Sequence, residues 1–314
     1  LDTTCSLVVN ATSLDCMGRN IVSLEGIQYF DNLRTLDCSD NQLTSLPSLP
    51  ASLTELDCSY NQLTALPNLP NSLTILNCEW NHLTALPTLP NSLTSLECTS
   101  NLLTALPTLP NSINTLYCRQ NILTALPNLP NSLTTLDCSV NQLTIWPPLP
   151  ASLNIFICTN NLLTALPSLP ASLTSLYCDD NRLTTLPSLP NSLTTLDCSA
   201  NELTALPSLP DSLHGFDCSV NFDLTCLPHL KKVQYFSFNM TRINCLPNYP
   251  QSNIASYPPL NSVPLCDLYN ANGCHVYWNI TGKTYYDANA NCVYNIGEST
   301  NPNLKLQLYS GGVL

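Results

Sequence analysis

The sequence is poor in basic residues, in glycine and in long apolar runs. Its 314 residues include only 9 Lys and Arg against 21 Asp and Glu, a net charge of −12 at pH 7. Nucleic acids and anionic membrane surfaces are bound through basic patches, so neither is expected as a partner. No stretch of about 18 apolar residues occurs, so the sequence predicts no membrane insertion. Only eight glycines are present, and none forms part of a phosphate-binding loop.

Histidine is also scarce, and this bears on catalysis. The four histidines, His82, His214, His229 and His275, fall in different parts of the chain. No nucleophile motif and no H-E-x-x-H sequence accompanies them. Serines and aspartates are abundant because a repeat carries them, so a triad assembled from them would be a numerical coincidence. We therefore expect no catalytic residues and no enzymatic activity in this chain.

What dominates the sequence is a twenty-residue repeat. Cysteine returns at this interval from Cys38 to Cys218, and asparagine follows three places later, from Asn41 to Asn221. One copy, residues 52–71, reads SLTELDCSYNQLTALPNLPN. A fixed period of this length predicts stacked supersecondary units. Each unit is too small to bury its own apolar face and must bury it against its neighbours, which defines a solenoid.

The positions of one repeat predict its local structure. Leu56 and Cys58 alternate inward on a short strand, and stacked strands would form a parallel sheet along the concave face. Asn61 follows the strand, where a buried amide can satisfy backbone groups of adjacent turns. The return, residues 66–70, contains two prolines, which favour an extended, polyproline-like path over a helix.

These residues carry a family resemblance. The pattern Leu-x-x-Leu-x-Cys-x-x-Asn-x-Leu resembles the leucine-rich repeat over roughly residues 10 to 250. The Leu-Pro-x-Leu-Pro return is similar to the short bacterial class, which includes secreted effectors of pathogens, some with a ubiquitin-ligase domain. Nothing in this sequence resembles that domain, so the resemblance implies recognition and no ligase activity.

The seventeen cysteines fall into two groups. Column residues of a parallel ladder stand ~4.8 Å apart and point the same way. A disulfide needs converging Cβ atoms nearer ~3.8 Å, so we expect the column, with Cys16 as its first member, to be buried free thiols. A metal-binding stack is disfavoured because the ligands would not converge.

The remaining cysteines flank the repeats, and their clustering favours an oxidising, extracytoplasmic compartment. They are Cys5, Cys226, Cys245, Cys266, Cys274 and Cys292. Cys226 and Cys245 occupy matching places in successive repeats and are candidates for a disulfide between them. Cys266 and Cys274 enclose a short loop and are further disulfide candidates. The pairing stays open at this point.

Four segments are expected along the chain. Residues 1–32 form an N-terminal cap with a degenerate repeat, 33–222 the regular repeats, and 223–275 degenerate repeats with a cysteine-containing cap. Residues 276–314 alternate as strands do and predict the start of a truncated, β-sandwich-type domain. The start at Leu1 without Met suits a mature secreted protein or a trimmed chain.

The last segment resembles a second family. Residues 282–292, GKTYYDANANC, and Gly297-Glu298 are similar to the start of the SdrD B-like domain of bacterial surface proteins. Such segments follow repeats in secreted proteins of the Bacteroidota type, often exported by the type IX route. The resemblance implies a longer parent chain on the bacterial outer surface.

The same segment predicts a structural Ca²⁺ site. Counting from Asp287, side-chain oxygens fall at positions 1, 3, 5, 9 and 12, with a backbone carbonyl at 7, as in a calcium loop. The ligands would be Asp287, Asn289, Asn291, Val293, Asn295 and Glu298. Cys292 stands where an EF-hand loop needs glycine, and no flanking helices are expected. The alternative is an Asn-rich turn between strands.

Large and charged side chains on the strand positions predict a binding surface. The residues singled out are Tyr60, Trp80, Tyr117, Arg119, Ile157, Tyr177, Asp179 and Asp180. Outward columns of a solenoid sheet form extended surfaces, and aromatic clusters are common interaction hot spots. The plainer interpretation is that aromatics favour strands and that single exposed apolar residues are normal.

We expect a binding or adhesion module for a protein or glycan on a cell surface. Stacked acids, such as Asp37 beside Asp57, would favour a cation or a basic partner, or would simply be solvated. One alternative function is a rigid spacer of a larger surface protein. Another is the recognition part of an enzyme whose catalytic domain follows Leu314.

Overall fold

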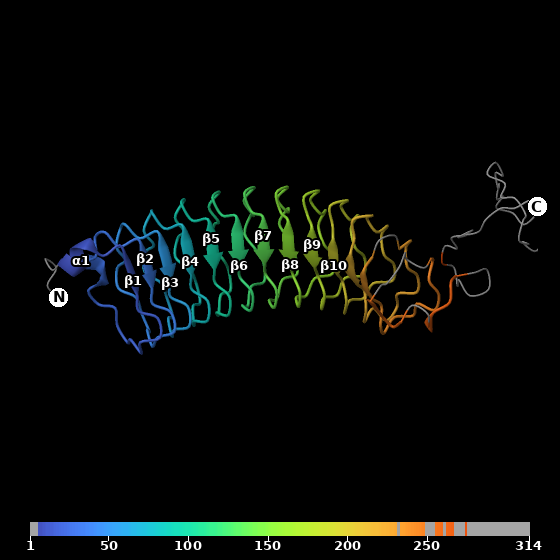
Figure 1. Ribbon diagram of the computed structural model, residues 1–314, viewed down its shortest axis with the longest axis horizontal. Coiled ribbons are helices and arrows are strands. Elements are labelled where there is room, and N and C mark those ends of the chain that lie inside the picture. Colours follow the sequence, from blue (N-terminus) through green and yellow to red (C-terminus); the bar gives the residue numbers. More distant parts are fainter. Residues whose placement is uncertain (1–5, 231–232, 249–254, 260–261, 267–273, 275–314) are drawn as a thin grey trace, which may run out of the picture. The chain divides into compact units, whose positions relative to one another are not determined.

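The computed structural model describes residues 6–230, 233–248, 255–259, 262–266 and 274 (Figure 1). The elements are α1 (Ser6–Asn10), β1 (Ser13–Asp15), the 3-10 helix η1 (Ile27–Tyr29), β2 (Thr35–Asp37), β3 (Glu55–Asp57), β4 (Ile75–Asn77), β5 (Ser95–Glu97), β6 (Thr115–Tyr117), β7 (Thr135–Asp137), β8 (Ile155–Ile157), β9 (Ser175–Tyr177), β10 (Thr195–Asp197), β11 (Gly215–Asp217), β12 (Tyr235–Ser237) and β13 (Ala255–Tyr257). Each repeat contributes one short strand and an extended return, and we call this unit a rung.

The strands form one parallel sheet of 13 strands in sequence order. Figure 1 shows them side by side, each joined to the next by a loop that returns behind the sheet. Equivalent residues face each other, so that Leu56 pairs with Leu36 on one side and Leu76 on the other. The irregular first strand keeps this register, with Leu14 opposite Leu36. The solenoid predicted from the repeat is confirmed.

Leucine and cysteine stripes form the core. In the rung of β3, Leu53, Leu56, Cys58 and Leu63 are at most 1% exposed. Leucines of the return, such as Leu66, are half-buried and pack against this core. The return itself contains no helix, as its two prolines predict.

The cysteine column consists of free thiols, as predicted. Cys16 and the column cysteines from Cys38 to Cys218 are buried and unpaired. Most of them donate a weak hydrogen bond to the next rung, such as Cys58 Sγ to the carbonyl of Asn77 at 3.4 Å. Burial is the main cause that raises the pKa of the Cys138 thiol well above its usual value, and the charges of the neighbouring thiols raise it further. The column therefore behaves as a dry spine of small, unreactive side chains.

The asparagine column joins rungs through its side-chain amides. Asn121 Nδ2 lies 3.0 Å from the carbonyl oxygen of Cys98 in the preceding rung and 3.1 Å from that of Cys118. Its Oδ1 accepts the N–H of Leu103 at 2.9 Å. The amide is 7% exposed, so these bonds replace those that water would make.

The residue before each asparagine adopts a left-handed backbone. Examples are Tyr60 (φ 51°), Trp80 (φ 49°), Ser100 (φ 53°) and Val140 (φ 52°). This region favours glycine, yet no glycine stands at these positions. Hydrogen bonds to the next rung, such as Tyr60 N to the carbonyl of Glu79 at 3.0 Å, hold the turn in place. The turn directs the chain out of the sheet and leaves the Tyr60 and Trp80 side chains about half exposed.

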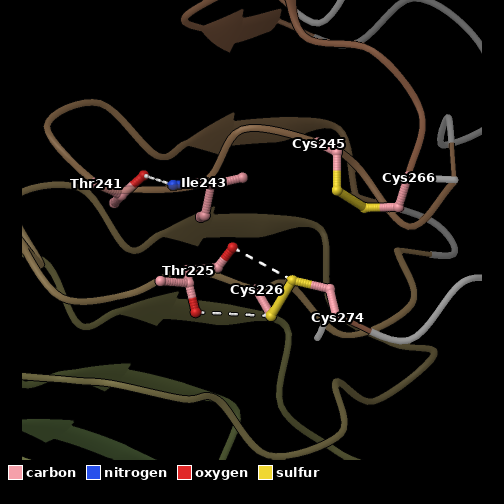
Figure 2. Close-up of a disulfide and its surroundings, with 7 residues drawn as sticks. All are labelled: Thr225, Cys226, Thr241, Ile243, Cys245, Cys266 and Cys274. Carbon is pink, nitrogen blue, oxygen red and sulfur yellow. Dashed lines mark hydrogen bonds between the residues drawn. A yellow bond between two sulfur atoms is a disulfide. The ribbon is translucent and has the colours of Figure 1, made fainter. Parts of the chain in front are cut away.

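Two disulfides lie at the C-terminal end of the sheet (Figure 2). They join Cys226 to Cys274 and Cys245 to Cys266. All four candidates are therefore disulfide-bonded, but the pairing of Cys226 with Cys245 is wrong. A parallel bridge between Leu246 and Leu265 brings Cys266, not Cys226, beside Cys245.

Some predictions fall on residues outside the described set. These are the strands of residues 276–314, the calcium loop from Asp287 to Glu298, and the cysteines Cys5 and Cys292. Within the described part of the chain, no helix has the length and hydropathy needed to cross a membrane.

Candidate functional site

The outward side of the sheet presents the side chains that do not enter the core. In each regular strand the central residue is buried, while the first and third are partly or fully exposed. These outward residues, together with the second and third residues after each strand, form a surface that we call the strand face. All of the predicted binding residues lie on it.

Two aromatic rings stack at one end of the strand face. The rings of Tyr60 and Trp80 are 5.6 Å apart between centroids and 13° from parallel. The two side chains remain 49% and 47% exposed. The left-handed turn of each rung sets this arrangement, because it places equivalent residues directly beside each other.

An open cavity of about 360 Å³ adjoins Trp80. Three predicted residues, Trp80, Tyr117 and Arg119, line this cavity together. Its other lining residues are Glu79, Glu97, Thr99, Ser100, Gln120 and Asp137. Side chains from four consecutive rungs thus meet around one hollow.

Two of the carboxyl groups that line this cavity, those of Glu79 and Glu97, have raised pKa values. Burial raises the pKa of Glu97 to about 7, with further contributions from the Glu79 carboxyl and from Asp57 and Asp137. Burial also raises the pKa of Glu79, although a hydrogen bond with Glu97 lowers it in part. Near neutral pH the Glu97 carboxyl is therefore partly protonated, and its hydrogen bond with Glu79 lets the pair share that proton.

The other predicted binding residues form a second group in the rungs of β8 and β9, directly after the rung of Asp137. Ile157 on β8 lies opposite Tyr177 on β9. Asp179 accepts a hydrogen bond from Thr159 Oγ1 at 2.6 Å, while burial raises the pKa of Asp179. Asp180 is exposed at a left-handed turn. None of these residues lines the cavity beside Trp80.

The repeated aspartates are held by their own rungs. Asp57 Oδ1 accepts the N–H of Ser59 at 3.0 Å and its hydroxyl at 2.6 Å, and Asn77 Nδ2 donates to Asp57 Oδ2 at 3.1 Å. The same bonds from serine recur at Asp37, Asp137, Asp197 and Asp217. These carboxylates therefore have partners within the protein. In the described ranges no cluster of three or more His, Cys, Asp or Glu is arranged to hold a metal.

Sequence reasoning did not single out Glu79, Glu97 or Ser100 as site residues. Glu79 and Arg119 stand where the aspartate-bearing rungs have serine, as in Ser59. Ser100 is small where Trp80 and Gln120 are large. Both departures from the repeat can be seen once its copies are aligned. That these residues line one cavity follows only from the packing of their side chains.

Comparison with known proteins identifies the family. The profile of the Leucine Rich Repeat matches residues 32–51. The structure of YopM, a leucine-rich effector protein from Yersinia pestis, is 38% identical, with 75% of this chain and 68% of that chain covered and a TM-score of 0.70. The chain belongs to the leucine-rich repeat family.

Two further structures of leucine-rich repeat proteins show the range of similarity. YopM from Yersinia enterocolitica WA-314 is 33% identical (TM-score 0.67), with 78% of this chain and 59% of that chain covered. The functional domain of InlJ from Listeria monocytogenes, described as including a cysteine ladder, is 30% identical (TM-score 0.56), with 82% of this chain and 55% of that chain covered. This leucine-rich repeat chain thus spans less than two thirds of either protein. A search of curated protein sequences found no significant match.

Proposed function

We propose that this leucine-rich repeat chain is the protein-recognition module of a secreted or surface-attached bacterial protein, and that it binds its partner through the strand face. One observation carries the proposal: half-exposed aromatic side chains and acidic side chains meet around an open cavity on that face. Aromatic residues that rim a hollow are typical binding hot spots.

The rigidity of the solenoid supports this function. Asparagine and cysteine side chains join each rung to its neighbours, as Asn121 joins the carbonyl of Cys98 and the amide of Leu103. A surface ordered in advance loses little conformational entropy on binding. The two disulfides near the C-terminal end of the sheet favour an oxidising location outside the cytoplasm.

Capture experiments with matched variants test the proposal. The chain would be used as bait on bacterial and host cell-surface fractions, in parallel with a Trp80→Ala/Tyr117→Ala variant and a Tyr29→Ala control. Tyr29 is 50% exposed on η1, away from the strand face. We expect a partner retained by the wild type and the control but lost by the double variant. Equal capture by all three baits, or none by any, would favour a rigid spacer instead.

The remaining assignments also belong to this proposal. The chain would carry no enzymatic activity itself, its residues 276–314 would begin an SdrD B-like domain, and it would be exported by the type IX route of Bacteroidota. Asp287 to Glu298 would bind structural Ca²⁺. Calcium is expected to raise the melting temperature of the intact domain, and an unchanged melting curve would remove the metal site from the proposal. The full gene would show whether a catalytic domain follows.

A further inference from the structure

The cavity beside Trp80 is a slot in a column of large side chains. Tyr60, Trp80, Ser100 and Gln120 occupy the same left-handed position in four consecutive rungs. Tyr60 stacks on one face of the Trp80 ring, and the cavity lies on the side of Ser100. Neighbouring strands are about 4.8 Å apart, so Trp80 and Gln120 are separated by about 10 Å. Serine is too small to fill that space, and the open cavity that remains beside Trp80 can admit one planar group.

The charges around the slot select a cation. Three acidic residues, Glu79, Glu97 and Asp137, line it against the single basic residue Arg119. Asp57 adds to the negative potential at both glutamates. A flat cation with several N–H donors satisfies both the ring and the carboxyls, because guanidinium stacks on Trp and bonds carboxylates in pairs.

We infer that the slot binds an arginine side chain of the protein partner, with its guanidinium stacked on the free face of Trp80 and hydrogen-bonded to Glu79 and Glu97. This inference rests on the proposed role of the strand face and adds the chemistry of the partner. Ser100 forms the floor of the slot, and its hydroxyl lies 3.1 Å from Gln120 Oε1. The arginine brings the lining charge closer to neutrality.

Arginine binding is coupled to release of the proton shared by Glu79 and Glu97. The pKa of Glu97 is raised to about 7 by burial and by Glu79, Asp57 and Asp137, with Arg119 as the cation that faces the same hollow. A guanidinium favours the ionised carboxyl and expels this proton. Affinity therefore rises with pH between about 5.5 and 8, by roughly tenfold.

Titration with a small arginine probe tests the inference. N-acetylarginine amide would be added to the intact chain at pH 8, with the indole N–H of Trp80 followed by NMR. Assignment of that signal comes from Trp80→Phe. We expect saturable binding at least tenfold tighter than that of N-acetylcitrulline amide, which has the same shape without the charge. Equal affinities, or a lysine analogue that binds more tightly than arginine, would overturn the inference.

Two matched variants locate the site. Ser100→Trp places a third ring in the slot and should weaken arginine binding at least tenfold. The backbone can accept this residue, because Trp80 stands at the equivalent left-handed position of the preceding rung. Ala200→Trp makes the same change at a left-handed position five rungs away (φ 48°) and should leave affinity within twofold. Circular dichroism verifies that both variants fold. Binding by Ser100→Trp equal to that of the wild type would refute the slot.

The outcomes also separate this inference from the proposed function. If Ser100→Trp still captures the macromolecular partner and no arginine probe binds, the strand face remains the binding surface and the arginine slot is wrong. If the arginine probe binds as described but no partner is captured by any bait, the proposed recognition function fails while the slot stands. Glu97→Gln should weaken arginine binding and remove its dependence on pH.

Discussion

Replacement of Asn121 by alanine provides a direct test of how the rungs are held together. Its side chain joins two rungs, since it donates to the carbonyl of Cys118 in its own rung and to that of Cys98 in the preceding rung, where it also accepts the N–H of Leu103. Alanine removes these bonds and leaves the groups in a region where the amide itself was only 7% exposed. The backbone of the rung can adopt the same path, so the effect isolates the amide.

The expected loss follows from the groups left without partners. The N–H of Leu103 bonds Asn121 Oδ1 at 2.9 Å, and an unsatisfied buried N–H costs about 1–3 kcal/mol. The two amide hydrogens each contribute about 1 kcal/mol in their bonds to carbonyls. The sum predicts that Asn121→Ala lowers the free energy of unfolding by about 3–5 kcal/mol.

Urea denaturation followed by circular dichroism measures this loss. Asn68→Ala is the matched control, because Asn68 is an exposed asparagine in the return of another rung. We expect the control to remain within about 0.5 kcal/mol of the wild type. A solenoid can unfold in segments, so calorimetry should accompany the denaturation curves. A loss below 1 kcal/mol for Asn121→Ala would refute the view that this column ties the rungs together.

Three further predictions concern other features of the chain. Because burial raises the pKa of Cys138, iodoacetamide at pH 8 should label fewer than about one in ten column cysteines in the native state and all of them in urea. Mass spectrometry measures the labelling. Extensive labelling of the native protein would contradict the dry spine. Because the pKa of Glu97 is raised in the folded protein, its contribution to stability is fully present below the unfolded pKa and is lost as pH rises toward 7. Glu97→Gln should therefore stabilise the protein by up to about 1 kcal/mol at pH 8 and leave its stability unchanged at pH 5. Melting temperatures of variant and wild type that run parallel across this pH range would contradict the prediction. Removal of the Cys226–Cys274 disulfide by a double serine variant should destabilise the C-terminal rungs by about 2–4 kcal/mol and expose them to limited proteolysis, while unchanged digestion would show that the crosslink is dispensable.

The core of this protein could be predicted from the repeat alone. Leu56, Cys58 and Asn61 recur at fixed spacing, and each role follows from the geometry of stacked strands. The free state of Cys58 was predictable because parallel side chains in a ladder do not converge. Once the register is set, every equivalent residue must share its environment.

Other features depend on interactions that the pattern does not contain. The left-handed backbone at Val140 opposes the local preference of a β-branched residue, and hydrogen bonds to the adjacent rung overrule it. The partner of Cys245 depends on where the chain returns after the last regular rungs, where the spacing has changed. The shared proton of Glu79 and Glu97 requires side-chain packing, which spacing alone cannot supply.

Specificity in this solenoid arises where the repeat is broken. In the rung of β3 the Asp57 carboxylate accepts two hydrogen bonds from Ser59, so that a rung of this kind presents a carboxylate whose partners lie within the protein. Around the slot, Glu79, Thr99 and Arg119 replace that serine, and the Glu97 carboxyl shares a proton with Glu79 instead. Because the leucine, cysteine and asparagine columns continue unchanged beneath these positions, the outward side chains can vary at little cost to the fold. The constant spine thus fixes where each outward residue stands, and the departures from the repeat determine what it binds.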